Sequence, residues 1–164
     1  MKKLLFCLLA LILIAGACGE SAREEAIEKK IEAATGADAE VDISKKQVKV
    51  TGETEEGEYA LTSGEDVEIP EDFPSDVFIY RPSTTVMAMK VPEGHSVTLT
   101  TGDDKSKVVQ ACKREMEASG WTEEGSMVMG DKTMLMYKKD GRVAGINMGP
   151  SDKGLHIVVT TGKE

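Results

Sequence analysis

The sequence has little cysteine, few aromatic residues and few histidines. Its 164 residues include three cysteines, two histidines, one tryptophan, three tyrosines and three phenylalanines. It also lacks a glycine-rich phosphate loop and the paired cysteine or histidine spacings of a zinc site. These absences remove the usual motif-based support for nucleotide, zinc or nucleophilic chemistry. We therefore expect a protein that is not an enzyme, with no cofactor and no catalytic residue.

Long apolar runs are missing except at the start of the chain. Lys2 and Lys3 precede residues 4–17, all of which are apolar or glycine. This run is too short to span a bilayer as a helix, which takes about 20 residues, but it matches a signal peptide. The small residues 15–17 lead directly into Cys18, and this pattern resembles the lipobox of bacterial lipoproteins. The resemblance implies removal of residues 1–17 and lipidation of Cys18. The alternative is an ordinary secretory signal with an unrelated cysteine.

The lipobox reading predicts where the protein is held. Several acyl chains on Cys18 give a stable membrane anchor, whereas one chain gives only marginal binding. Gly19 follows the cysteine, which resembles an outer-membrane sorting signal. We expect a lipid-anchored envelope protein. It would face the periplasm from the outer membrane if the cell has two membranes, and otherwise lie on the outer face of the cytoplasmic membrane.

Positive charge is also scarce. Without Lys2 and Lys3, residues 18–164 carry 18 basic and 29 acidic side chains, so their formal charge is 18 − 29 = −11. Nucleic-acid binding depends on neutralising phosphates, so nucleic acid is excluded as a partner. Anionic lipid headgroups would repel this chain, which leaves the anchor as the contact with the membrane. Cys112 has no second cysteine to pair with once Cys7 is removed and Cys18 is lipidated.

Residues 18–64 are expected to form a small N-terminal unit. Residues 21–36 have a helical period, a capping-box spacing from Ser21 to Glu24, and a charged outer face that includes Glu28. Apolar and polar residues then alternate over 39–43, 47–51 and, less clearly, 58–62. The pattern predicts an α-β-β unit with an optional third strand.

Residues 65–82 read as an acidic, proline-rich connector. Prolines disfavour regular structure here, yet the segment holds half of the six aromatic residues that follow Cys18, namely Phe73, Phe78 and Tyr80. A purely solvated linker would not carry them. We expect the connector to lie against the next domain, with these aromatics either binding a partner or belonging to the core.

Residues 83–164 form the clearest domain. Strand patterns at 84–91 and 96–101 precede a helix at about 104–119, and four more strand patterns follow at 121–129, 133–138, 142–148 and 155–161. Short turns between them predict antiparallel pairing, with the helix on one face of the sheet. The predicted fold class is α+β: a small αββ(β) unit followed by a ββαββββ domain with one helix packed on an antiparallel sheet.

Several stretches together resemble a group of bacterial envelope lipoproteins that has no established activity. They are "IPEDFPSDVFIY", "VVQACKREMEASGW" and "KKDGR", preceded by "EKKIEAATGADAEVDI". The resemblance covers nearly all of the chain after Cys18. It implies an envelope location and this fold, and it supplies no catalytic residue.

Methionine is the one unusual abundance. Three M-x-M pairs fall on expected strands, where residues i and i+2 share a face: Met87 and Met89, Met127 and Met129, and Met134 and Met136. Thioethers are soft ligands that select Cu(I), so the pairs suggest a Cu(I) or Ag(I) site. The alternative is that these methionines are adaptable core residues.

Cys112 has little support as a nucleophile. It lies on the apolar stripe of the second helix, and neither His95 nor His156 stands at a recognisable catalytic spacing from it. The sequence as a whole favours a membrane-anchored envelope lipoprotein that acts as a non-catalytic binding or scaffolding module for an envelope protein or another envelope component. Soft-metal binding is the alternative function.

Overall fold

A computed structural model describes residues 20–35, 39–44 and 46–164. The signal segment 1–17 and the predicted lipidation site Cys18 lie outside the described residues. The helices are α2 (Glu20–Thr35) and α3 (Lys105–Ala118). The strands are β1 (Ala39–Ile43), β2 (Gln47–Thr54), β3 (Gly57–Gly64), β4 (Thr84–Val91), β5 (Gly94–Thr101), β6 (Thr122–Met129), β7 (Lys132–Lys139), β8 (Arg142–Ser151) and β9 (Gly154–Lys163).

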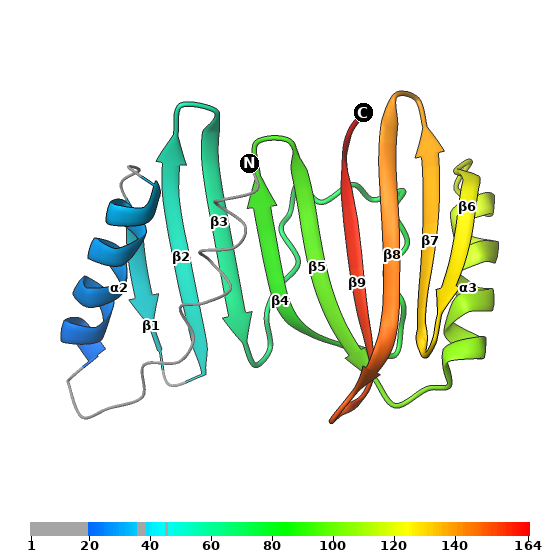
Figure 1. The fold of residues 1–164 in the computed structure, drawn as a ribbon, viewed down its shortest axis with the longest axis horizontal. Helices are drawn as coiled ribbons and strands as arrows, with labels where there is room; N and C mark the ends of the chain where they lie inside the picture. Colours follow the sequence, from blue (N-terminus) through cyan, green and yellow to red (C-terminus); the bar gives the residue numbers. More distant parts are fainter. Residues whose placement is uncertain (1–19, 36–38, 45) are drawn as a thin grey trace.

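The expected fold class is wrong. In the part of the chain that the structure describes, nine strands form one antiparallel sheet in the order β1-β2-β3-β4-β5-β9-β8-β7-β6, rather than a small unit beside a separate domain. Figure 1 shows this sheet running across the whole molecule, with α2 and α3 at its two ends. After β5 the chain crosses through α3 to the far edge, and β6 to β9 then step back until β9 pairs with β5.

The pairing of β3 with β4 joins the two expected units. Residues 60–63 of β3 pair antiparallel with residues 87–90 of β4. The connector between these strands, residues 65–83, runs behind the sheet in Figure 1. Its expected contact with the following domain is confirmed, because Val77 and Tyr80 are each only 3% exposed and lie in the main core.

The two helices cover opposite faces of the sheet. Residues that stand directly opposite each other in antiparallel strands point to the same face. Val50 pairs with Leu61, and Leu61 pairs with Met89, so the face that α2 covers at β2 continues onto β4. Val97 is one position removed, opposite Ala88, and therefore points to the other face, which α3 covers.

The main core lies under α3. The apolar stripe of this helix, Val108, Cys112 and Met116, is at most 1% exposed. It packs on a row of residues that follows the strand pairing across β5, β9, β8 and β7: Val97, Val159, Ile146 and Leu135. Burial of this apolar area at about 25 cal/mol per Å² holds the helix on the sheet.

The smaller core lies under α2, where Ile31 packs with Val41 and Val50. Two acidic side chains one helical turn apart also bind the edge of the sheet: Glu28 accepts a hydrogen bond from the backbone N–H of Val41 at 3.0 Å, and Glu24 accepts one from Ile43 at 2.8 Å. The expected roles of Glu24 in a capping box and of Glu28 on a solvated face are thus replaced by contacts with β1.

Among the described residues, no helix is long and apolar enough to cross a membrane.

Candidate functional site: a charged groove beside the β4–β5 turn

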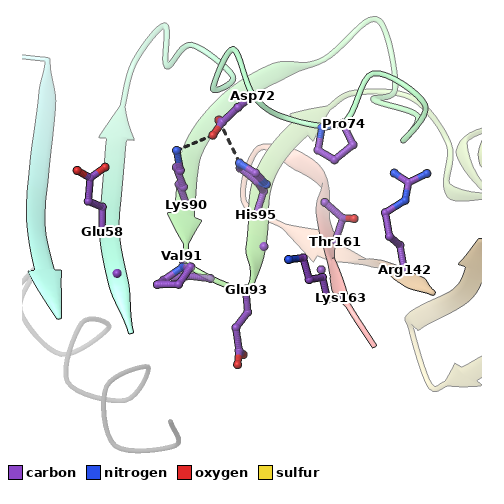
Figure 2. Close-up of a pocket in the computed structure, with 14 residues that line it drawn as sticks. Glu58, Asp72, Pro74, Lys90, Val91, Glu93, His95, Arg142, Thr161 and Lys163 are labelled. Carbon is purple, nitrogen blue, oxygen red and sulfur yellow. Dashed lines mark hydrogen bonds and ion pairs between the residues drawn. The ribbon is translucent and has the colours of Figure 1, made fainter. Parts of the chain in front are cut away.

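A groove of about 410 Å³ opens at the end of the sheet where β4 turns into β5. It is lined by the start of β3, the β4–β5 turn, Arg142 of β8, the end of β9 and the connector (Figure 2). Charged side chains of both signs surround it: Glu58, Asp72, Lys90, Glu93, His95, Arg142 and Lys163. A second depression of about 570 Å³ adjoins it and shares Glu58 and Lys90.

Asp72 ties the connector to the floor of the groove. Its carboxylate lies 2.5 Å from the Lys90 ammonium and 3.1 Å from Nε2 of His95 (Figure 2). The hydrogen bond from Lys90 lowers the pKa of Asp72, and the same contact raises the pKa of Lys90. His95 also meets the ring of Phe73 edge to face at 5.8 Å. These contacts leave the His95 side chain only 13% exposed, so it is not a freely solvated turn residue.

Asp76 fixes the connector a second time, on the other side of Pro74. Its two carboxylate oxygens accept hydrogen bonds from Arg142 at 3.0 and 2.6 Å, and Lys139 donates a third at 2.7 Å. The Arg142 contact is the main cause that holds the pKa of Asp76 well below its usual range. The Trp121 indole N–H donates to the Asp76 carbonyl at 2.8 Å, and Arg142 stacks over the Trp121 ring at 5.0 Å.

The aromatic residues of the connector lie in or against the core. Tyr80 is 3% exposed, and its hydroxyl donates to Asp103 at 2.6 Å. Phe73 and Phe78 are half-buried and pack against the same core. The Phe78 backbone N–H also lies 3.4 Å from the Met116 sulfur. The two alternatives for these aromatic residues were partner binding and membership of the core. The structure supports the second, so we propose no partner-binding surface on them.

The six candidate methionines lie on the face opposite α3 but do not meet at one place. Met127, Met129, Met134 and Met136 lie together on the β6–β7 hairpin, where Met127 pairs directly with Met134. Met87 and Met89 are on β4, and β5, β9 and β8 separate β4 from β7. At about 4.8 Å per strand, the two groups are about 19 Å apart. A site that includes all six is therefore wrong geometrically.

Cys112 is inert in this fold. It is 1% exposed on the buried face of α3, and burial raises the pKa of its thiol to about 12. A thiolate is the reactive form of cysteine, and it is almost absent at neutral pH with such a pKa. Within the described ranges, no three histidine, cysteine, aspartate or glutamate residues gather closely enough to hold a metal ion.

Sequence reasoning missed the two aspartate contacts, although their members lie in the stretches that carry the family resemblance. Asp72 and Asp76 are in "IPEDFPSDVFIY", Trp121 ends "VVQACKREMEASGW", and Lys139 and Arg142 are in "KKDGR". Asp76 and Arg142 are 66 positions apart. The motifs marked these residues, but nothing local in the sequence indicates that the three stretches converge.

The comparisons add one finding. The sequence model of a family described as START domain-like matches residues 83–154, which run from the start of β4 to the start of β9 and make up less than half of the chain. This segment is similar to that family over β4, β5, α3 and β6 to β8. No curated protein and no solved structure matches the chain.

Proposed function

We propose that this protein is a lipid-anchored, non-catalytic binding module of the bacterial envelope that holds a small polar ligand in the groove beside the β4–β5 turn. The observation that carries the proposal is the groove itself, together with the START domain-like match over β4, the β4–β5 turn, β5 and β8, which supply half of its lining residues; that match is compatible with a ligand-binding module. Its volume of about 410 Å³ falls within the usual range of small-molecule sites, about 300–1,000 Å³.

The wall of the groove is fixed in advance, which favours binding. The connector is held by Asp72 and by Asp76 on either side of Pro74, and Pro74 itself lines the groove. A ligand therefore does not have to order this segment, and binding does not carry that entropic cost.

The charges of the groove indicate the kind of ligand. Asp72 neutralises Lys90, and Asp76 neutralises Arg142. Glu58 and Lys163 are exposed on opposite sides of the opening (Figure 2). A ligand that carries both a cationic and an anionic group would complement these two side chains, with its apolar part against Pro74, Val91 and Pro92.

The groove is tested with the full chain extracted from membranes in a mild detergent. Native mass spectrometry would detect a bound molecule on the wild type. A Glu58→Lys, Lys163→Glu double variant reverses the two exposed charges without changing the net charge. An Asp152→Lys, Lys153→Glu variant makes the same exchange on the exposed β8–β9 turn. We expect the bound molecule to be lost only from the groove variant. Equal retention in all three proteins, or no bound molecule in any, would contradict the proposal.

The anchoring part of the proposal rests on the lipobox pattern before Cys18. A Cys18→Ser change is expected to abolish incorporation of radiolabelled palmitate and to release the chain from membranes. Membrane retention of the variant without label would contradict anchoring through Cys18. It would leave the groove proposal open to its own test.

A further inference from the structure

Four methionines gather on the exposed face of the β6–β7 hairpin. Met127, Met129 and Met136 are 48%, 58% and 40% exposed, and Met134 is half-buried between them. β6 is the last strand of the sheet, and no described element pairs with its outer edge. The cluster therefore lies at an accessible corner of the molecule, on the face opposite α3.

The strand register brings these side chains within reach of one another. Met127 stands directly opposite Met134, where Cβ atoms are about 5 Å apart. Met136 is two positions along β7 on the same face and is diagonal to Met127, and Met129 is diagonal to Met134. Diagonal Cβ atoms are about 7 Å apart, which long side chains can bridge. Two strands thus present four thioethers from one surface.

Glycines clear the space around Met136. Gly125 faces it on β6 and Gly145 faces it on β8. A Cβ built on Gly125 would lie 3.2 Å from the Met136 methyl carbon, so the Met136 side chain lies over Gly125, toward β6. This orientation directs the thioether toward the strand that carries Met127.

The large apolar residues on the open face of the β6–β7 hairpin are all methionines, which favours a role for their sulfur atoms over hydrophobic packing alone. Every large apolar side chain on the open face of β6 and β7 is a methionine, whereas the covered face of β7 carries Leu135 and Tyr137. Apolar side chains exposed on an edge strand are a liability for aggregation. The presence of thioethers at this edge, where charged residues would protect against aggregation, is explained if the sulfur atoms bind a ligand.

From this geometry we infer that Met127, Met134 and Met136, with Met129 beside them, bind one soft monovalent cation, Cu(I) or its redox-inert analogue Ag(I). Thioethers are soft ligands that select this class of ion over Zn²⁺, Mg²⁺ or Ca²⁺. The free thiol among the described residues, that of Cys112, is buried on the opposite face and does not compete. The site does not depend on the groove ligand.

The ligand set also predicts how binding responds to pH. A thioether carries no proton that must leave before the metal binds, in contrast to histidine or thiolate ligands. Affinity for Ag(I) should therefore be the same at pH 5.5 and pH 7.5.

The test uses the full chain in detergent, with ¹³C-labelled methionine methyl groups and silver nitrate as the probe. We expect one equivalent of Ag(I) to shift the methyl signals of the four hairpin methionines and to leave those of Met87, Met89, Met116 and Met148 in place. Signals that all remain still, or that all shift together, would overturn the site. This readout needs no substitution and so does not depend on the stability of a variant.

Two variants then assign the ligands. Leucine is close to methionine in volume, so Met127→Leu, Met134→Leu, Met136→Leu should keep the fold while removing three sulfurs. We expect this change to weaken Cu(I) binding at least tenfold, measured by competition with a chromophoric Cu(I) chelator under anoxic, reducing conditions. The matched control, Met87→Leu with Met89→Leu on the same face, should bind within twofold of the wild type. Equal losses in both variants would refute the assignment.

Discussion

The contact between Asp76 and Arg142 is the strongest polar link between the connector and the sheet, and its loss should be measurable. The perturbation is Asp76→Asn, which keeps the shape of the side chain and removes its charge. Three charge-assisted hydrogen bonds end on this carboxylate. The side chains of Asp76, Lys139 and Arg142 are 27%, 23% and 31% exposed, so water screens them only in part.

The expected magnitude follows from these contacts. Hydrogen bonds to charged groups contribute about 1.5–3 kcal/mol each, and partial exposure reduces that to about 1 kcal/mol each. Asparagine retains one acceptor oxygen, so we expect the free energy of unfolding to fall by about 2 kcal/mol. With a urea m-value of about 2 kcal/mol per M, the midpoint of unfolding should fall by about 1 M.

The pH dependence gives an independent check. The folded pKa of Asp76 is depressed, so its contribution is present above the ordinary aspartate pKa of about 4 and is lost as the pH falls toward the folded value. The difference between wild type and variant should therefore be constant from pH 7 to about 5 and should shrink below about 4.

The assay is urea unfolding of the detergent-solubilised full chain, followed by the fluorescence of Trp121, the single tryptophan, which is 3% exposed and contacts Asp76 directly. Asp152→Asn, on an exposed turn, is the control and should change stability by less than about 0.5 kcal/mol. The reasoning is refuted if Asp76→Asn unfolds at the wild-type midpoint, or if the difference between the two persists unchanged at pH 3.

Two further predictions concern close packing. Gly94→Ala would place a Cβ 2.0 Å from the Thr161 carbonyl oxygen on β9, so it should lower stability by about 3 kcal/mol. The Cβ of a Gly102→Ala variant would meet no atom within 4 Å, so this change should be nearly neutral. Equal melting temperatures of the Gly94→Ala and Gly102→Ala variants would contradict the prediction. Cys112 should resist iodoacetamide at pH 7 in the folded protein, because its pKa of about 12 leaves almost no thiolate. The Cys112 peptide should be alkylated fully in urea at pH 8.5, and rapid labelling of the folded chain would count against its burial.

The elements of this fold could be predicted from sequence, but their assembly could not. Strand patterns at residues 39–43 and 84–91 coincide with β1 and β4, because local alternation of apolar and polar residues determines them. The pairing of β3 with β4 leaves no such signal. It joins only residues 60–63 with 87–90, across the long connector 65–83 and not through a short hairpin turn. The single sheet, and with it the placement of α2 and α3 on opposite faces, depends on that pairing.

The side-chain contacts beside the candidate groove also could not be predicted from the sequence. Asp76 and Arg142 are ordinary charged residues in the sequence, and their contact depends on how the connector returns over β8. The M-x-M pairs can be recognised in the sequence, because residues i and i+2 share a face of a strand. Which pairs would meet depended on strand order: β6 and β7 are neighbours, whereas β4 lies on the far side of β5, β9 and β8.

The contacts of Glu24 and Glu28 with β1 make the two ends of the sheet unequal. These carboxylates occupy the N–H groups of Val41 and Ile43, which an added strand would need for pairing. The opposite edge, at β6, carries no such cover among the described residues. Among the described residues, the outer edge left open to main-chain pairing is therefore that of β6, about 38 Å from the α2 edge across eight strand spacings. Within the described part of the chain, an added strand would extend the sheet at its β6 edge, beside the exposed methionines.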